Sequence, residues 1–352
     1  ERESFNEILE YMPDPVLKQL AKMANSGNSK GVGVMPGGVG YQDMGGRVTR
    51  YPLRRIDKPE PGVHRDISLT RRWMDAMGVD ICVLFPSPML QLGLHPQVET
   101  EVALAWAYNR WLCERILQEE SRIRSMIYLP FNDPDESYKI VKEFAGKKGV
   151  CGFMVTSVRH KPVHHNSYMK IYSMLEEMNL PLGFHAGYNW NEQSMGLMNK
   201  FISVHAIGFV FHNMVHLTNW VLNGLGERFP KLKVIWIESG LAWLPFMIQR
   251  LDNEYLMRSS ECPSLKKLPG DRRIGVGVVN QKLENVEAVE TIVAKLEQAA
   301  KIFGPSRVLV NPDCGFATSA DNPVTSAAVA EKKLAHMVEA ARIMRERYPN
   351  TH

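Results

Sequence analysis

The most constraining feature of this sequence is a regular alternation of short apolar runs with longer amphipathic stretches, which begins at Gly78 and continues toward the C-terminus. The apolar runs have the length of buried strands, and the amphipathic stretches repeat their apolar residues at helical spacing. Strands that alternate with helices pair in parallel, because the intervening helix returns the chain to the same edge of the sheet. The sequence therefore predicts an α/β fold with a parallel sheet.

The number of strands points to a particular architecture. Strands are expected within 78–88, 122–130, 149–157, 180–187, 231–240, 273–280 and 307–315. A closed (β/α)8 barrel of the TIM type needs eight strands, one more than this. Residues 1–77 are expected to form an irregular, glycine-rich segment and the first helix of the barrel, with Gly31–Met35 as a weak strand candidate. We therefore predict a TIM-type barrel whose first strand is absent or atypical.

Composition excludes several classes of protein. The 352 residues are 45% hydrophobic and 23% charged, which is typical of a globular chain. The net charge of +4 is spread along the chain, so no nucleic-acid surface is expected, and no apolar stretch approaches the roughly 20 residues that span a bilayer. The five cysteines form no CxxC pair, which favours a reducing, cytoplasmic setting. A small-molecule substrate remains as the expected partner, and a homo-oligomer is left open.

Polar side chains gather where the expected strands end, and in barrels of this type the reactive groups sit at the C-terminal ends of strands. The residues at these positions are Ser87, Asn132, Asp133, Thr156, Ser157, His185, Glu238, Asn280, Asp313 and Cys314. Imidazole and carboxylate groups suit one divalent metal, Zn²⁺ or Mn²⁺, with a position open for water. We predict His185 and Asp313 as metal ligands, and Glu238 and Asp313 as catalytic groups.

Each of these residues also has a purely structural interpretation. A histidine that ends a strand is often a hydrogen-bonded core residue, and Asp313 could cap the last helix. Cys314 could be a small buried hydrophobe. Glu238 directly follows the apolar run "VIWI", so its carboxylate must either leave the core for a polar mouth or be charge-paired.

A second set of residues could line a pocket. His212 and His216 lie four positions apart on one helical face, but "HNMVH" lacks the glutamate of the HExxH motif. Two such histidines are more typical of pocket-lining positions than of metal ligands. The candidate pocket residues are His212, His216, Trp190, Asn280 and Cys314.

Five sequence blocks carry a resemblance to a known family. They are "LTRRWMDAMGVDICVLFPSP", "ALAWAYNRWLCE", "LPFNDPDESYKIVKEFAGKKGVCGFMV", "LPLGFHAG" and "FPKLKVIWIESGLAWLPFMIQRLDNEY". From about Asp66 to Lys267 the chain resembles the amidohydrolase-2 family, whose best-known members are similar to aminocarboxymuconate-semialdehyde decarboxylase. The resemblance implies a (β/α)8 barrel with one divalent metal.

The same resemblance implies roles for particular residues. The family's metal-binding histidine after its fifth strand falls on His185, and the aspartate that ends its eighth strand falls on Asp313. Many members carry a catalytic histidine after the sixth strand, where this chain has Glu238, as does the subgroup with an "ESG" motif. The family's H-x-H metal pair has no match in this chain.

The last part of the chain resembles a different barrel family. Residues from about 272 to 348, including "RVLVNPDCG", resemble the C-terminal end of cobalamin-independent methionine synthase, whose zinc-ligating cysteine would fall on Cys314. The partner H-x-C pair of that family has no match. We therefore expect amidohydrolase-like barrel strands over 78–270, and over 271–352 methionine-synthase-like final βα units that complete the same barrel, as in a chimera.

Three functions follow as hypotheses. The first is a metal-dependent amidohydrolase-type enzyme, a hydrolase or a carbon–carbon lyase, which hydrolyses or non-oxidatively decarboxylates a small carboxylated or cyclic substrate. The second is a catalytically incomplete barrel that acts as a binding or scaffold protein, which the lack of H-x-H favours. The third is a zinc-dependent methyltransferase that uses Cys314, against which the lack of H-x-C argues.

Overall fold

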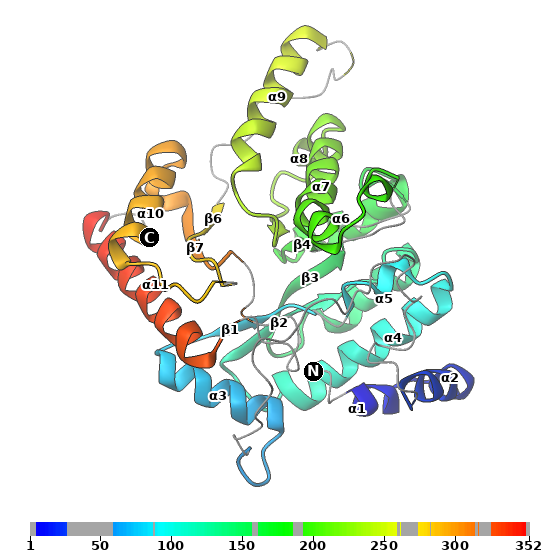
Figure 1. The fold of residues 1–352 in the computed structure, drawn as a ribbon. Coiled ribbons are helices and arrows are strands. Elements are labelled where there is room, and N and C mark those ends of the chain that lie inside the picture. Colours follow the sequence, from blue (N-terminus) through cyan, green and yellow to red (C-terminus); the bar gives the residue numbers. More distant parts are fainter. Residues whose placement is uncertain are drawn as a thin grey trace. The chain divides into compact units, whose positions relative to one another are not determined.

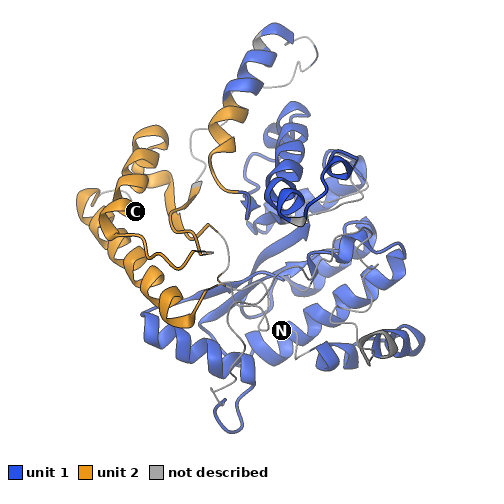
Figure 2. Cartoon of the chain, in the orientation of Figure 1, with its two compact units in different colours: residues 1–46, 57–239, 249–266 blue, residues 47–56, 240–248, 267–352 orange. Residues whose placement is uncertain are grey.

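The computed structural model describes residues 5–26, 59–86, 89–156, 161–185, 193–258, 261, 274–281, 283–313, 316 and 325–349. The chain forms two compact units, coloured separately in Figure 2. Unit 1 comprises residues 1–46, 57–239 and 249–266, and unit 2 comprises 47–56, 240–248 and 267–352. Each unit has its own parallel sheet and its own hydrophobic core.

The sheet of unit 1 has five parallel strands, whose order in space follows their order in the chain (Figure 1). They are β1 (Cys82–Leu84), β2 (Ile123–Tyr128), β3 (Val150–Thr156), β4 (Leu182–His185) and β5 (Val234–Ile237). At their C-terminal ends the register places Thr156 of β3 opposite His185 of β4, and His185 opposite Ile237 of β5. The ends of three neighbouring strands therefore meet at one edge of the sheet.

The helices of unit 1 connect and cover these strands. They are α1 (Phe5–Glu10), α2 (Pro15–Ser26), α3 (Arg65–Met77), α4 (Val98–Trp111), α5 (Pro134–Phe144), α6 (Met169–Glu177), α7 (Phe201–Leu222) and α8 (Leu225–Arg228). A π-helix, Leu112–Leu117, continues α4, and α9 (Trp243–Arg258) contains residues of both units. None of the helices within the described ranges combines the length and the apolar character that crossing a membrane requires.

Aromatic side chains fix α7 on the sheet of unit 1. The ring of Phe184 in β4 stacks on Trp236 of β5, with ring centroids 5.0 Å apart, and its edge meets Trp220 of α7 at 6.0 Å. Phe184 is fully buried. Such contacts add to the free energy of apolar burial, so α7 has a defined position beside the ends of β4 and β5.

Unit 2 contains two βα units. Its parallel strands are β6 (Ile274–Gly277) and β7 (Val308–Asn311), and its helices are α10 (Val289–Phe303) and α11 (Ala327–Arg347). Gly304 ends α10 at a φ of +87°, which only glycine adopts without strain. The core between these elements includes Val276, Ile292 and Met337.

The α/β fold with a parallel sheet is confirmed, and each predicted strand contains an observed one. The strands form a five-stranded and a two-stranded sheet in the part of the chain that the structure describes. The strand candidate Gly31–Met35 lies outside those residues. An atypical first strand and the closure of a single barrel stay predictions.

Within the segment that was expected to be irregular, residues 5–10 form α1 and residues 15–26 form α2. Phe5, Ile8 and Leu9 of α1 are buried and lie at helical spacing. The segment with this spacing is too short to be recognised beside the glycine-rich stretch that follows. Before α2, the carboxylate of Asp14 accepts hydrogen bonds from the backbone N–H groups of Val16 and Leu17. Asp14 followed by proline is thus a helix-start signal that the sequence interpretation missed.

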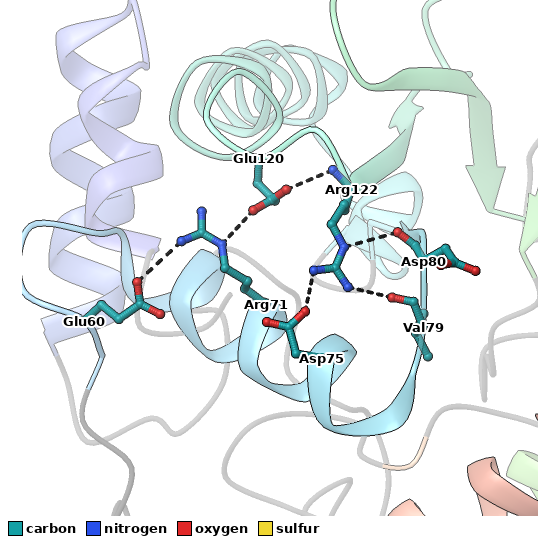
Figure 3. Close-up of polar contacts among 7 residues, drawn as sticks. All are labelled: Glu60, Arg71, Asp75, Val79, Asp80, Glu120 and Arg122. Carbon is teal, nitrogen blue, oxygen red and sulfur yellow. Dashed lines mark hydrogen bonds and ion pairs between the residues drawn. The ribbon is translucent and has the colours of Figure 1, made fainter.

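An arginine–carboxylate network joins α3 to the starts of β1 and β2. Figure 3 shows its residues: Glu60, Arg71, Asp75, Val79, Asp80, Glu120 and Arg122. Glu120 lies at the centre, where its carboxylate accepts from Arg71 Nε at 2.7 Å and from the backbone N–H of Arg122 at 3.0 Å. The Arg122 guanidinium in turn donates to the Val79 carbonyl at 2.7 Å. The network lies at the N-terminal ends of the strands, where barrels carry stabilising groups.

Replacing Glu120 by glutamine is expected to lower the free energy of unfolding at neutral pH by about 1.5–3 kcal/mol, because hydrogen bonds to a charged acceptor are lost. The N–H of Arg122 is the main cause that lowers the pKa of Glu120, and Arg71 also lowers it, although burial opposes both. The folded-state pKa therefore lies below 4.5, the ordinary value. The stabilisation is present above the ordinary pKa and is lost as the pH falls through the folded-state pKa.

Urea unfolding of wild type and Glu120→Gln, at neutral pH and at about pH 3, measures this contribution. The difference between the two proteins should shrink in acid. Glu143→Gln is the matched control, because Glu143 pairs with Lys147 at 2.7 Å but its side chain is 48% exposed. Equal losses in both variants at neutral pH would contradict the role of the network.

Candidate functional site

Two of the predicted site residues, His185 and Glu238, lie side by side. His185 is the last residue of β4, and Glu238 directly follows β5. His185 Nε2 lies 3.0 Å from Glu238 Oε2. The side chain of His185 is 5% exposed and that of Glu238 is 19% exposed. The two parallel strands thus bring an imidazole and a carboxylate together at their C-terminal ends, with the carboxylate nearer to solvent.

The backbone at Glu238 has an unusual conformation. Its φ is +59°, a left-handed value that is rare for residues other than glycine and that costs free energy. The next residue, Ser239, donates its hydroxyl to the Ile237 carbonyl at 3.0 Å and so bridges the turn. Strained backbone of this kind persists where the surroundings hold it, and it gathers at functional sites.

The neighbours of His185 are buried or half-buried. The ring of Phe85, just after β1, meets the imidazole edge-on, with centroids 6.4 Å apart. Thr156, opposite His185 in the neighbouring strand, is fully buried. An environment with little water strengthens the interaction between the imidazole and the Glu238 carboxylate.

The pair fits a divalent metal in both donor type and spacing. Two ligands that lie about 2.0–2.2 Å from one ion, at roughly 90–110° to each other, are separated by about 3–3.5 Å. The distance of 3.0 Å between His185 Nε2 and Glu238 Oε2 agrees with this range. No group of three His, Cys, Asp or Glu side chains that could hold an ion occurs within the described residues. Because catalytic zinc usually has three protein ligands, the pair would be part of a ligand set.

Asp313 lies in unit 2, two residues beyond β7. Its backbone N–H donates to the Val279 carbonyl at 3.0 Å, and its carboxylate lies against Gly277 of β6. A Cβ at Gly277 would come within 2.2 Å of Asp313 Oδ1, so only glycine leaves room for this orientation. His185 belongs to unit 1, and a shared metal site for His185 and Asp313 therefore stays a prediction.

Replacing Gly277 by alanine is expected to turn the Asp313 carboxylate away from its present position. The clash is with the end of a side chain, which can rotate, so the free energy of unfolding should fall by only about 1 kcal/mol. If Asp313 serves the reaction, activity should fall as far as in Asp313→Asn. Gly275→Ala is the control, because a Cβ there would meet Asn311 Nδ2 at 2.5 Å instead. Full activity in Gly277→Ala, measured beside a melting curve, would remove Asp313 from the site.

Asn280 is held firmly within unit 2. Its backbone N–H donates to Glu287 Oε1 at 2.8 Å, and its carbonyl accepts from Lys333 Nζ at 3.0 Å. The Lys333 side chain is fully buried and also donates to Glu287 Oε2 at 2.7 Å. Asn280, three residues beyond β6, thus has a fixed backbone, and its role in a pocket stays a prediction.

Two of the other predicted pocket residues, His212 and His216, are each 6% exposed in α7. The His216 ring lies 5.8 Å from the ring of Phe184, the residue before His185. The predicted positions Ser87, Ser157, Trp190 and Cys314 lie outside the described residues.

The polar residues after β2 have structural partners. Asn132 Nδ2 donates to Glu101 Oε2 at 2.7 Å and to the Gly93 carbonyl at 2.8 Å. The Asp133 carboxylate caps α5 by accepting from the backbone N–H groups of Asp135 and Glu136. Asp133, which follows β2, therefore acts as the N-cap of α5.

Sequence reasoning missed Asn213, which lies in α7 between the predicted pocket histidines. It is fully buried, and its side chain donates to backbone carbonyls beside His185 and Glu238. A signal was present, because an amide inside an apolar helix needs buried hydrogen-bond partners. The sequence does not reveal which partners they are.

A family model described as Amidohydrolase matches residues 88–310, well over half of the chain. The matched range includes β2 to β6 and most of β7. Among curated proteins, methionine synthases match a shorter stretch. The enzyme of Saccharolobus solfataricus is 34% identical over 82 residues, 23% of each chain, and that of Methanothermobacter marburgensis is 34% identical over 99 residues, 28% of this chain and 30% of that protein. The chain thus spans less than a third of these relatives.

Solved structures of similar fold include several decarboxylases. The 5-carboxyvanillate decarboxylase of Sphingomonas paucimobilis has a TM-score of 0.53 at 19% identity, covering 82% of this chain and 87% of that one. The 2,6-dihydroxybenzoate decarboxylase of Rhizobium has a TM-score of 0.52 at 18% identity, covering 79% and 88%. A manganese complex of the 5-carboxyvanillate decarboxylase of Novosphingobium aromaticivorans has a TM-score of 0.55 at 17% identity, covering 79% of both chains. At these identities the likeness concerns the fold, a TIM-type barrel of which the unit 1 sheet represents about half.

Proposed function

The chain belongs to the Amidohydrolase family, and from this premise we propose that it is a metal-dependent enzyme that decarboxylates or hydrolyses a small carboxylated or cyclic substrate. The observation that carries the proposal is the pair of His185 and Glu238 at neighbouring strand ends, 3.0 Å apart. Decarboxylation of a hydroxylated aromatic acid is the first reaction to test, because the similar structures named as decarboxylases act on such acids.

We propose one divalent ion, Zn²⁺ or Mn²⁺, held by His185 together with Asp313 and Glu238. The manganese in one similar structure supports an ion of this class. When bound, the ion would act as a Lewis acid that draws electron density from the substrate carboxylate or from water. The ring of Phe85, which lies edge-on to the imidazole, would help to orient it toward Glu238.

Glu238 would transfer the proton through its other carboxylate oxygen, since Oε2 is the one that faces His185. In decarboxylation the carbon–carbon bond breaks, carbon dioxide leaves, and the carbon that retains the electron pair must receive a proton. In hydrolysis a carboxylate takes a proton from the attacking water. Either task needs a carboxyl group that reaches the substrate, and the Glu238 side chain is 19% exposed whereas that of His185 is 5% exposed. Asp313 is the second candidate for this role.

The two-part organisation of the chain belongs to the same proposal. We propose that residues 271–352 supply final βα units of methionine-synthase type to an amidohydrolase-like barrel whose first strand is atypical. The main segment of unit 2 begins at Lys267, close to the expected join near 270, which supports this origin. The partial match to methionine synthases supports it as well.

A binding or scaffold protein is the second candidate function. It is favoured by the lack of an H-x-H pair in the sequence. The zinc-dependent methyltransferase is the third candidate function, supported by the partial match to methionine synthases.

The experiment combines metal analysis of the purified protein with assays on a panel of hydroxylated aromatic acids and lactones. We expect about one ion per chain, and turnover that a chelator abolishes and Mn²⁺ or Zn²⁺ restores. A protein that takes up no ion and turns over no substrate would support the scaffold instead. Methyl transfer to a thiol would support the third candidate.

A further inference from the structure

A single buried amide contacts the backbone on both sides of the proposed site. Asn213 of α7 is fully buried, and its Nδ2 donates to the Phe184 carbonyl at 3.3 Å and to the Ile237 carbonyl at 3.2 Å. It also donates to the Ser239 hydroxyl oxygen. Its nitrogen must be the atom that faces these groups, since an amide oxygen there would oppose two carbonyl oxygens.

The acceptors are the chain neighbours of the two site residues. Phe184 precedes His185, and Ile237 and Ser239 stand on either side of Glu238. Glu238 has the left-handed φ of +59°, which an unrestrained chain would leave. One side chain thus restrains both the end of β4 and the strained turn after β5.

The hydrogen bonding of Asn213 is poorly suited to a role in stability alone. One nitrogen with two hydrogens serves three acceptors, and Asn213 Oδ1 is buried without a hydrogen-bond partner among the residues that the structure describes. A buried acceptor left unpaired lowers stability. The aromatic contacts of Trp220 already attach α7 to the sheet.

We propose that Asn213 is a positioning residue that holds the Glu238 carboxylate against the His185 imidazole. It keeps the Ile237–Ser239 turn in its strained conformation and ties that turn to the end of β4. Without the amide, Glu238 relaxes and its carboxylate moves away from His185 Nε2. The inference rests on the proposed function in taking this pair as the active site, but the contact itself can be measured without metal or substrate.

The test compares Asn213→Ala with Asn109→Ala. Asn109 of α4 is equally buried, and it bonds the end of a different strand through Tyr128, donating to the carbonyl at 2.9 Å and accepting from the N–H at 3.2 Å. Both variants remove a buried amide between a helix and a strand end. Only Asn213→Ala removes one beside His185 and Glu238.

The first readout is the imidazole N–H signal of His185 in metal-free protein labelled with ¹⁵N-histidine, assigned by its loss in His185→Gln. Wild type and Asn109→Ala should retain this signal, because the Glu238 carboxylate protects the proton from exchange. In Asn213→Ala the proton should exchange at least about tenfold faster or the signal should vanish. The second readout is Mn²⁺ affinity by electron paramagnetic resonance, which should fall about 10–100-fold in Asn213→Ala and hardly change in Asn109→Ala.

Ser239→Ala covers the case in which Asn213→Ala fails to fold, because it removes one acceptor and leaves α7 intact. In Ser239→Ala the His185 proton should also exchange faster than in wild type, but by a smaller factor than in Asn213→Ala. The positioning role is overturned if the His185 proton stays protected from exchange in folded Asn213→Ala. If only Ser239→Ala folds, protection of the proton in that variant overturns it. The role is also overturned if Asn109→Ala loses as much protection of this proton as Asn213→Ala does. Loss of the signal in Asn213→Ala alone supports the positioning role even if wild type binds no Mn²⁺, a result that would contradict the proposed function instead.

Discussion

Replacing His185 by alanine is expected to remove the bound metal and to lower turnover by more than about 100-fold. Loss of a partner that only supports a metal ligand costs about 10–100-fold in affinity or activity, so loss of a ligand should exceed that range. The melting temperature should change little, because the remaining Glu238 carboxylate is 19% exposed and water can hydrate it in place of the imidazole. Metal content per chain, steady-state kinetics and a melting curve measure the three effects.

His64 offers a matched control for this substitution. Its side chain is 7% exposed, and its Nε2 lies 3.1 Å from Glu7 Oε2, much as His185 lies beside Glu238. Its Nδ1 also accepts from the backbone N–H of Asp66 and so caps α3. His64→Ala should therefore cost about 1–3 kcal/mol of stability and leave the metal content unchanged. If His185→Ala behaves like His64→Ala, then His185 is a core histidine.

Replacing Lys333 by methionine is expected to have the largest effect on stability, a loss of about 3–5 kcal/mol. The Lys333 ammonium is fully buried and donates to the carbonyls of Asn280 and Asn285 and to the Glu287 carboxylate. Methionine matches the volume but leaves these acceptors unpaired and Glu287 without its cation. Chemical unfolding of both proteins measures the loss.

The pH dependence of this contribution follows from Glu287. Burial alone would raise the pKa of Glu287, but hydrogen bonds from Lys333 and from the N–H of Asn280 outweigh it and lower the pKa. The pair therefore stabilises the fold above the ordinary carboxyl pKa of 4.5, and this stability is lost as the pH falls through the lower folded-state value. The double variant Lys333→Met/Glu287→Leu should recover part of the loss, because it leaves no uncompensated charge.

Lys295→Met is the control for Lys333→Met. Lys295 is exposed and donates to the Val278 carbonyl at 3.1 Å in the same unit. Its replacement should change the free energy of unfolding little, because water can take over that hydrogen bond. If the free energy of unfolding falls no more in Lys333→Met than in Lys295→Met, the buried ion pair does not stabilise the fold.

Much of the fold could be predicted from the sequence, because buried parallel strands and amphipathic helices leave different periodicities. Runs such as "VIWI" are apolar and have the length of a strand, and β5 lies there, with Ile237 buried and Ile235 exposed. The N-terminal helices escaped this reasoning. The six residues of α1 span fewer than two turns, so its periodicity carried little weight beside the glycines that follow.

The candidate site could be predicted only in part. The positions of His185 and Glu238 after apolar runs marked them as strand-end residues, and the structure brings them together as neighbours. Their contact depends on the register of β4 and β5 and on the left-handed φ of Glu238, neither of which a linear pattern contains. The bonds of Asn213 likewise depend on where α7 packs, and the space for Asp313 depends on the pairing of Gly277 in β6.

The location of the metal tests the central claim most directly. Crystals of the protein grown with Mn²⁺, measured on both sides of the manganese absorption edge, give an anomalous difference map that locates each bound ion independently of assumptions about ligands. We expect a single peak per chain, in contact with His185 Nε2 and a carboxylate oxygen of Glu238, with Asp313 completing the ligand set. A map without a peak at His185, or with its only peak at a pair such as His64 and Glu7, would contradict the claim.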